Sequence, residues 1–445
     1  MASVNRQLLQ SAGVASLGSF LFGFDTAVIS GATDALRLHF TLDASRLGFT
    51  VASALIGTIV GSIAVGGPLE TRGRRLVLRA LALVYVVSAV GCGLAWSWGA
   101  LVAFRFLGGV AIGGSSVAAP MYIAEIAPPE SRGRLVALAQ LNIVVGILVA
   151  YLSNSLVELA VGGPESAAWR VMLGAPVLPA LLFYVLTFGM PESPRWLVGR
   201  GRRDDALDVL RRVGAADPAA VVADVVASLR GETDAAREPF FTAKYRKPIL
   251  LALMVATFNQ VSGINALIYY TADIFAMAGA GRTSALWQSV VIGVTNLVFT
   301  LLAMSVIDRV GRKRLLLIGS VGLAVCLFVA AWALQTKAAG SLVLVSLIGY
   351  IASFAFSQGA VIWVYLAEIF PNRVRARGQA LGSFTHWVWA AAVSWTFPIV
   401  AEASGGLPFV IFGVLMVVQF VAVAVLLPET RGVSLEAIQK QMGIE

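Results

Sequence analysis

The segment Tyr122-Ile-Ala-Glu125-Ile-Ala-Pro128 returns 243 residues later as Tyr365-Leu-Ala-Glu368-Ile-Phe-Pro371. The same spacing relates the basic residues that follow, because Arg132 and Arg134 recur as Arg375 and Arg377. A seven-residue motif with its trailing arginines is hard to produce twice by chance. The two segments therefore indicate an internal duplication, and the organisation of the chain can be worked out from them in both directions.

Two further motifs repeat in the same order at almost the same offset. Glu70, Gly73 and Arg74 recur 238 residues later, and Pro191-Glu192-Ser193 recurs 237 residues later; the second copies are Asp308, Gly311, Arg312 and Pro428-Glu429-Thr430. Three motifs in one order indicate that a whole structural unit was duplicated. Parallel duplication of this kind is typical of secondary transporters, which hold their substrate between the two halves near the middle of the bilayer.

The composition excludes a soluble globular protein. Of 445 residues, 58% are hydrophobic and only 13% are charged, and the mean hydropathy is +0.84, whereas soluble domains carry about 25% charged residues. Runs of about 20 apolar residues are long enough to cross a bilayer as helices, and we expect twelve of them. The sequence predicts an all-α membrane protein with six-helix halves at 1–190 and 248–427, a cytoplasmic linker with short helices at 191–247, and a cytoplasmic tail at 428–445.

The charge distribution predicts the topology. The chain carries 33 Lys and Arg and a net charge of +9, and most of the basic residues fall between spans on the side of the N-terminus. Because short cytoplasmic loops are enriched in Lys and Arg, both termini are expected in the cytoplasm. The basic balance thus reflects a lipid environment and not a nucleic-acid partner. Apolar residues recur at helical spacing in 203–213 and 218–229, which predicts amphipathic helices in the linker.

Two charged residues lie inside predicted spans. Asp25 interrupts the apolar run 17–29, and Arg105 interrupts the run 100–119. At about 1.5 Å per residue, both fall in the outer half of the hydrocarbon core, within reach of each other. One interpretation is a structural ion pair that ties two helices together. The other is a proton-titrated pair that drives transport.

Polar amides also lie inside the spans, where Gln140, Gln260, Asn265 and Asn296 supply groups that both donate and accept hydrogen bonds. A neutral polyol needs such groups, together with an aromatic face for the C–H side of its ring. Gly263 lies between Gln260 and Asn265, where a locally broken helix would turn backbone groups toward a cavity. The alternative for each amide is a hydrogen bond that holds two helices together.

The chain resembles the sugar porter family of the major facilitator superfamily over essentially its whole length. The segment Gly23-Phe-Asp25-Thr-Ala-Val-Ile-Ser-Gly31 is similar to proton-coupled bacterial pentose and hexose symporters in particular. The other matching segments are Gly73-Arg-Arg75, Asp308-Arg-Val-Gly-Arg-Lys313, Pro191-Glu-Ser-Pro-Arg-Trp-Leu197, Gln260-Val-Ser-Gly-Ile-Asn265 and Pro428-Glu-Thr-Arg-Gly432. The resemblance implies the major facilitator fold, with two pseudo-symmetric halves, in the bacterial inner membrane.

The resemblance also implies site residues. Trp363 and Tyr269 are expected to line the sugar cavity, with Asn259 and His386 at its variable edge. Two of these positions depart from the family pattern, since a second Gln is common at Asn259 and an amide is usual at His386. Facilitators of the family commonly carry a neutral residue at the position of Asp25, which favours proton coupling in this chain.

Acidic and basic residues at the helix ends of one membrane face are interpreted as a cytoplasmic gate. Ion pairs between the halves would close the inner side and break when the halves rock. Positive-inside topology combined with helix capping is the alternative. The predicted gate residues are Arg74, Arg75, Glu125, Arg132, Glu192, Arg195, Asp308, Arg312, Glu368, Arg375 and Glu429.

These features together predict proton-coupled symport of a pentose or hexose by a monomer that uses protons as its coupling ion and needs no cofactor or metal. A facilitative sugar uniporter and a proton-coupled cyclitol or polyol transporter remain as alternatives. The chain shows no nucleophile, metal-ligand cluster or phosphate-binding glycine loop, so an enzyme is not expected.

Overall fold

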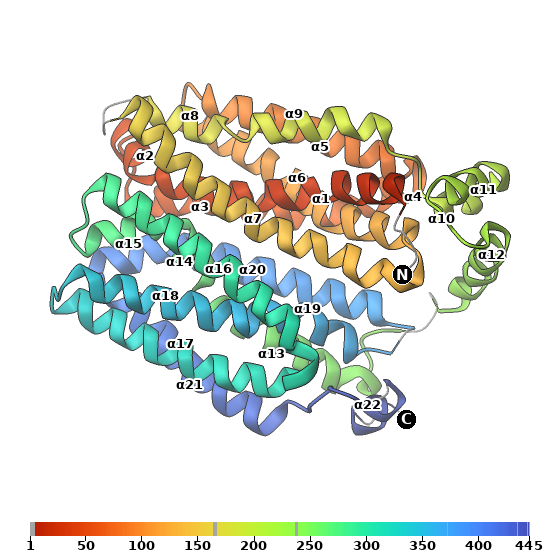
Figure 1. The fold of residues 1–445 in the computed structure, drawn as a ribbon. Helices are drawn as coiled ribbons and strands as arrows, with labels where there is room; N and C mark the ends of the chain where they lie inside the picture. Colours follow the sequence, from red (N-terminus) through yellow and green to blue (C-terminus); the bar gives the residue numbers. More distant parts are fainter. Residues whose placement is uncertain are drawn as a thin grey trace. The chain divides into compact units, whose positions relative to one another are not determined.

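The computed structural model describes residues 5–162, 167–235, 239–371, 373–433, 435–442 and 444, and every regular element among them is a helix (Figure 1). The elements of the first half and of the segment after it are α1 (Arg6–Val28), η1 (Ile29–Gly31), α2 (Thr33–His39), α3 (Ala44–Ala64), α4 (Gly66–Arg72), α5 (Arg74–Gly93), α6 (Trp98–Ile126), α7 (Pro129–Val161), α8 (Ala168–Gly174), α9 (Val177–Leu186), η2 (Thr187–Gly189), α10 (Pro194–Gly199), α11 (Arg203–Arg212) and α12 (Pro218–Ala235).

The second half continues with the same architecture. Its elements are η3 (Ala243–Tyr245), α13 (Arg246–Val261), α14 (Ile264–Tyr269), α15 (Thr271–Met277), α16 (Arg282–Val310), α17 (Arg312–Gln335), α18 (Gly340–Phe356), α19 (Gln358–Glu368), α20 (Arg375–Ala403), α21 (Leu407–Leu426) and α22 (Leu435–Met442). The predicted amphipathic helices of the linker are present as α11 and α12.

Eleven helical segments of the described chain are long and apolar enough to cross a membrane. The twelfth predicted span, 380–400, is also helical, since it lies within the 29 residues of α20. This helix is not one of the eleven. Its polar residues, among them Thr385, His386 and Ser394, dilute its hydropathy, although its length is sufficient.

The helices pack into two compact units. The first consists of Met1–Thr26, Ser53–Ala150 and Trp169–Arg237, and the second of Ala27–Ala52, Tyr151–Ala168 and Glu238–Glu445. The grouping follows packing and assigns the ends of α1, α3 and α7 to the second unit. The predicted boundaries at 190, 247 and 427 follow the duplication, and they stay a prediction.

In the first unit, glycines allow close packing of α3 against α6. A Cβ atom on Gly109 would lie 1.9 Å from the carbonyl oxygen of Ala54, and one on Gly113 would lie 2.0 Å from that of Thr58. These glycines of α6 therefore let α3 approach closely, as small residues commonly do at helix contacts in membranes.

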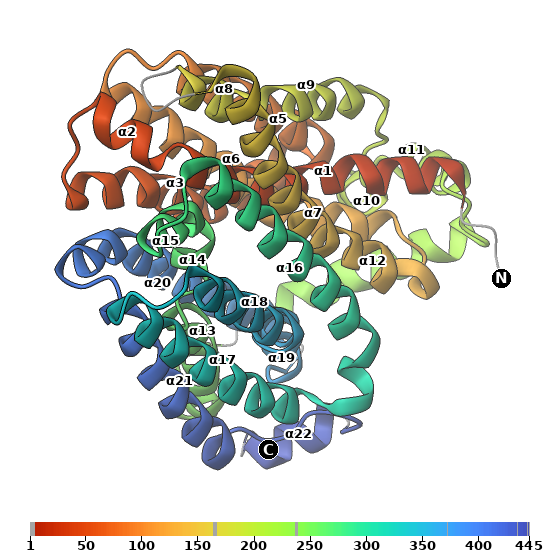
Figure 2. The same cartoon turned by 60° about the vertical axis from the view of Figure 1, so that its left-hand side comes forward.

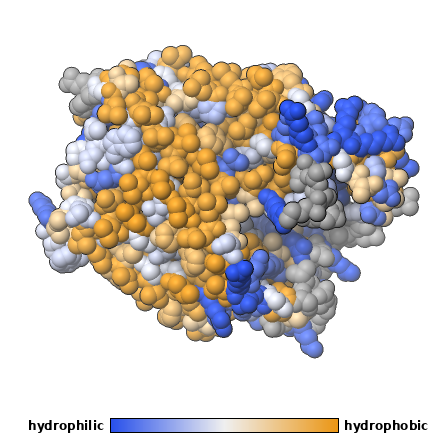
Figure 3. All heavy atoms as spheres, in the orientation of Figure 1, coloured by the Kyte–Doolittle hydropathy of each residue, from blue (hydrophilic) through white to orange (hydrophobic). Residues whose placement is uncertain are grey.

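Hydrophilic side chains gather over α10, α11 and α12, whereas apolar atoms cover the long helices (Figure 3).

In the second unit, α17 packs between α18 and α21, and α13 runs along α20 (Figure 2). Two helices of this unit are interrupted. Gly263 separates α13 from α14 with a left-handed backbone, φ +89° and ψ +10°, as the sequence predicts. Ser357 separates α18 from α19 with φ −121° and ψ −87°. Such interruptions inside a membrane protein expose backbone groups that neighbouring side chains must satisfy.

Candidate functional site

The structure brings the two intramembrane charges together in the first unit. Nη2 of Arg105 on α6 lies 3.7 Å from Oδ2 of Asp25 on α1. The Arg105 side chain is 1% exposed and that of Asp25 is 21% exposed. The separation is an ion pair longer than a direct charge-assisted hydrogen bond, which is typically about 2.7–2.9 Å. The carboxylate is therefore the open member of the pair, and the guanidinium is enclosed.

A small cavity adjoins this pair. Its polar lining comes from Asp25 and Arg105 together with Tyr85, Ser88 and Cys92. Ser88 donates its hydroxyl hydrogen to the carbonyl oxygen of Phe104, 2.8 Å away, so this hydroxyl group already has a hydrogen-bond acceptor on α6. The arrangement leaves the Asp25 carboxylate at the wall of a cavity that Arg105 also lines.

A second polar cluster lies in the second unit and is centred on Gln260 of α13. Its Nε2 donates to Oδ1 of Asn259 at 2.9 Å, and its Oε1 accepts from Nδ2 of Asn265 at 2.8 Å. Asn265 follows the interruption at Gly263, which is how a residue five positions along reaches back to Gln260. The three amides are thereby held by one another and present donors and acceptors in a fixed arrangement.

His386 of α20 completes this cluster. Both of its ring nitrogens lie 3.2 Å from Nε2 of Gln260, and only one of them can accept a hydrogen bond in a neutral imidazole. The ring of Trp363 on α19 lies 5.1 Å from that of His386, centroid to centroid. Trp363 is 38% exposed, so part of this aromatic side chain stays accessible next to His386.

The remaining predicted site residues are less closely connected. Tyr269, at the end of α14, is buried. Asn296 on α16 is also buried, and its side chain forms no hydrogen bond to another described residue. Gln140 lies half-buried on α7, in the first unit. The structure thus gathers Asn259, Gln260, Asn265, Trp363 and His386 into one cluster, and the roles of all eight residues stay predictions.

Predicted gate residues form a compact motif in the first unit. Nε and Nη2 of Arg74 donate to the two carboxylate oxygens of Glu125, at 2.9 and 2.8 Å. The backbone N–H groups of Arg74 and Arg75 donate to Oε1 of Glu192, at 2.9 and 3.1 Å. Glu192 therefore caps the start of α5, where the helix dipole favours an anion.

The second unit repeats this motif residue for residue. Nη2 of Arg312 lies 2.8 Å from Oε1 of Glu368, and the backbone N–H groups of Arg312 and Lys313 donate to Glu429 at 2.9 and 3.1 Å. Arg312 also contacts Asp308 at 3.0 Å. The duplication seen in the sequence thus extends to hydrogen bonds.

Three other predicted gate residues have different contacts. Arg132 donates to the carbonyl oxygen of Ala127 at 3.5 Å, and Arg375 donates to that of Phe370 at 3.4 Å. The guanidinium of Arg195 contacts the Ser228 hydroxyl at 3.5 Å. The described pairs of Arg74 and Arg312 each lie within one unit, and the proposed closing of a gate between the halves stays a prediction.

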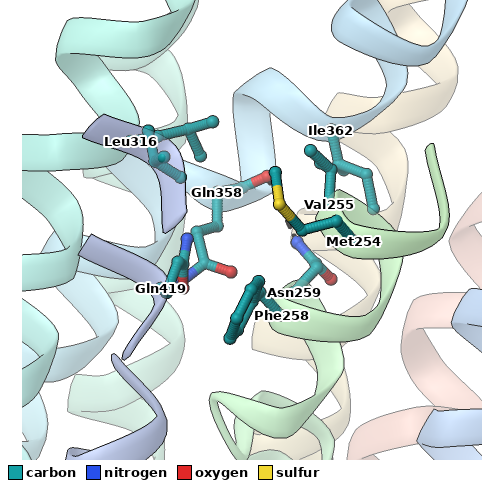
Figure 4. Close-up of a pocket in the computed structure, with 9 residues that line it drawn as sticks. Met254, Val255, Phe258, Asn259, Leu316, Gln358, Ile362 and Gln419 are labelled. Carbon is teal, nitrogen blue, oxygen red and sulfur yellow. Dashed lines mark hydrogen bonds between the residues drawn. The ribbon is translucent and has the colours of Figure 1, made fainter. Parts of the chain in front are cut away.

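Sequence reasoning missed several polar contacts. Gln358 and Gln419 line a small cavity beside Asn259 (Figure 4). Each is a lone amide in an apolar run, and the same signal identified Gln140, so both could have been found from the sequence.

Two polar contacts within the second unit join a residue from the first half of the sequence to one from the second half. Thr33 donates to Asp273 at 2.7 Å, and Arg282 pairs with Glu158 at 2.9 Å.

A family model described as "Sugar (and other) transporter" matches residues 12–442 of the chain. The D-xylose-proton symporter of Escherichia coli is 37% identical over 463 aligned residues, which cover 96% of this chain and 94% of that protein. The arabinose-proton symporter of Bacillus subtilis is 35% identical over 435 residues, covering 96% and 93%.

Solved structures match to the same extent. The inward open conformation of the xylose transporter XylE from E. coli has a TM-score of 0.87 and 34% identity, covering 98% of this chain and 99% of that one. The structure of XylE bound to 6-bromo-6-deoxy-D-glucose matches with a TM-score of 0.80, 34% identity and the same coverage. The major facilitator fold that the sequence predicts is therefore confirmed.

Proposed function

Because this chain belongs to the sugar (and other) transporter family, we propose that it is a secondary active transporter that carries a monosaccharide, a pentose or hexose, together with a proton. Its helices make it an integral, multi-pass membrane protein. We place it in a bacterial inner membrane with both termini in the cytoplasm. It works there as a monomer in lipid, with protons as the coupling ion and no cofactor, and it leaves the sugar chemically unchanged.

The observation that carries the proposal is the ion pair between Asp25 and Arg105. A carboxylate inside a membrane protein is expensive and marks a functional site by default, above all a proton relay. Here its partner is fully enclosed, while Asp25 itself is partly open and lines a cavity. Protonation of Asp25 removes the charge that Arg105 faces, so proton binding changes the interaction between α1 and α6.

The amide cluster around Gln260 supports the choice of substrate. Asn259, Gln260 and Asn265 carry groups that both donate and accept hydrogen bonds, and a sugar hydroxyl needs both. Trp363 offers an exposed aromatic face, on which the C–H side of a sugar ring can lie. The described cluster carries no charged side chain, which favours a neutral polyol over an anion.

The coupling follows from these two sites. With Asp25 protonated and sugar bound, the carrier reorients and releases both on the other side; with sugar bound and Asp25 still charged, it does not. A proton that crosses about 100 mV supplies about 2.3 kcal/mol. This is enough for an approximately 50-fold sugar gradient before any pH difference is added.

The test is uptake of labelled pentoses, hexoses and inositol into proteoliposomes, with and without an inward proton gradient, by the wild type and by Asp25→Asn. We expect the wild type to accumulate one sugar above equilibrium. The variant is expected to exchange or equilibrate that sugar without accumulating it. Accumulation that survives in Asp25→Asn would refute proton coupling through this residue, and equilibration that ignores the gradient in both proteins would indicate a facilitative uniporter.

Inositol belongs in the panel because a further relative, 34% identical over 438 residues, is named the major myo-inositol transporter of B. subtilis. A cyclitol presents the same ring of hydroxyl groups as a sugar, so the amide cluster suits both. Accumulation of inositol in preference to every sugar would make the chain a proton-coupled cyclitol transporter.

A further inference from the structure

A second pair of amides adjoins the proposed sugar site within the second unit. Nε2 of Gln358, the first residue of α19, donates to Oε1 of Gln419 on α21 at 2.9 Å. Both side chains are buried, with exposed fractions of 1% and 2%. Nε2 of Gln358 also lies 3.3 Å from the sulfur of Met416, one turn before Gln419 on α21. The start of α19 is thus held against α21.

The pair is connected to the sugar site through the backbone. Nδ2 of Asn259 donates to the carbonyl oxygen of Gln358 at 3.3 Å, and Oδ1 of Asn259 accepts from Gln260 at 2.9 Å. Gln358 therefore links α21, through its side chain, to the amide cluster on α13, through its backbone carbonyl oxygen. Asn259 holds its place between Gln260 on one side and the start of α19 on the other.

The same helix carries the aromatic wall of the site. Trp363 lies five residues after Gln358 on α19, and its ring contacts that of His386. The interruption at Ser357 separates α19 from α18, so α19 does not inherit its orientation from a continuous helix. Its orientation depends on contacts of its own, and one of them is the hydrogen bond between the side chains of Gln358 and Gln419 at its first residue.

Simple adhesion between helices does not account for Gln358. Its Oε1 is buried and has no hydrogen-bond partner among the described residues. A buried acceptor without a partner is destabilising, whereas an apolar side chain of the same shape would hold α19 to α21 without that cost. Figure 4 shows the Gln358 side chain at the small cavity that Phe258 and Asn259 line from α13. Stability alone therefore does not favour an amide at this position.

We propose that Gln358 and Gln419 are positioning residues of the sugar site, which set the places of Asn259 and Trp363 and thereby the selectivity among sugars. This inference rests on the proposed function. Neither glutamine is required to touch the sugar, because both act through the orientation of α19.

The test compares Gln419→Met with the wild type in proteoliposomes. Methionine keeps the length of the side chain but removes the acceptor for Gln358. We expect KM for the transported sugar to rise about fivefold, as the loss of one hydrogen bond of about 1 kcal/mol allows. The pentose-to-hexose preference is expected to change, while kcat and the amount of inserted protein stay close to wild type. Gln288→Met is the matched control, because this glutamine on α16 donates its hydrogen bond to Ser284 of its own helix, at 3.0 Å.

A double variant, Gln358→Met with Gln419→Met, separates positioning from stability. It removes the buried unpaired oxygen together with its neighbour, so its melting temperature is expected to be at least as high as that of the single variant. Its KM and sugar preference are expected to stay altered. An unchanged KM and an unchanged preference in both variants would overturn the inference while leaving sugar transport intact. If the wild type carries none of the sugars, the proposed function fails, and this inference fails with it.

Discussion

Gly73 of the first unit and Gly311 of the second have nearly the same backbone conformation, with φ, ψ of +89°, +162° and +98°, +156°. Each faces a glutamate that caps the following helix. A Cβ atom on Gly73 would lie 2.5 Å from Oε2 of Glu192, and one on Gly311 would lie 2.6 Å from Oε2 of Glu429. This region of backbone space is essentially restricted to glycine. The motif therefore needs glycine for two reasons, its dihedral angles and the space that the carboxylate occupies.

The first prediction follows from this geometry. Gly73→Ala and Gly311→Ala are each expected to lower the free energy of unfolding by about 1–3 kcal/mol, because the backbone is strained and the capping glutamate is displaced. Thermal unfolding of the purified protein in detergent measures the effect. Gly133→Ala on α7 is the control, since nothing lies within 4 Å of a Cβ at that position; alanine is favoured there as in any exposed helix. Equal melting temperatures for all three variants would contradict the assignment.

The second prediction concerns the two kinds of arginine at the helix ends. Arg74→Gln removes two charge-assisted hydrogen bonds to Glu125 in a largely buried place and is expected to cost about 2–3 kcal/mol of unfolding free energy. Arg132→Gln removes only a long contact to the carbonyl oxygen of Ala127 and is expected to cost less than about 1 kcal/mol.

The same comparison can be made in the second unit with Arg312→Gln and Arg375→Gln. Arg312 contacts Glu368 and Asp308, whereas Arg375 contacts the carbonyl oxygen of Phe370. Unfolding followed by denaturant or heat gives the ranking. If the Arg132 and Arg375 variants were the more damaging ones, the ion pairs within the units would not be the main stabilising contacts of these motifs.

The duplicated motifs explain why much of this structure could be predicted from sequence. The offset between copies identified Arg74 with Arg312 and Glu192 with Glu429, and their contacts correspond. Helical rise placed Asp25 and Arg105 at a similar depth in the membrane and within reach of each other, and the structure adds that α1 and α6 bring them to 3.7 Å. The break at Gly263 followed from the conformational freedom of glycine next to two polar amides.

Other features depend on tertiary geometry that no local pattern encodes. Gln358 and Gln419 are lone amides on separate helices, and the sequence does not say that they face each other. The choice of Glu125, and not a neighbouring acid, as the partner of Arg74 depends on how α5 packs on α6. Hydropathy alone also under-reports α20, because its polar residues, His386 among them, are the ones that a transport site needs.

The third prediction concerns His386, which departs from the family pattern and adjoins the amide cluster. A ring nitrogen of His386 accepts a hydrogen bond from Nε2 of Gln260 in this arrangement. His386→Leu removes that acceptor, so the Gln260 amide is held in place only by Asn259 and Asn265 and has to be ordered when sugar binds, which weakens binding by about 1–2 kcal/mol. We therefore expect KM for the transported sugar to rise about tenfold in His386→Leu. His386→Gln restores an acceptor oxygen and is expected to transport with a KM close to that of the wild type. Initial rates of uptake into proteoliposomes over a range of sugar concentrations give both values.

The other histidine of the chain, His39, supplies the control for this prediction. It is exposed on α2, and its ring lies edge-on against that of Phe40, so His39→Leu is expected to leave KM unchanged. A wild-type KM in His386→Leu would show that the imidazole only fills space between α13 and α20, and the sugar would then be recognised through Asn259, Gln260 and Asn265 without it.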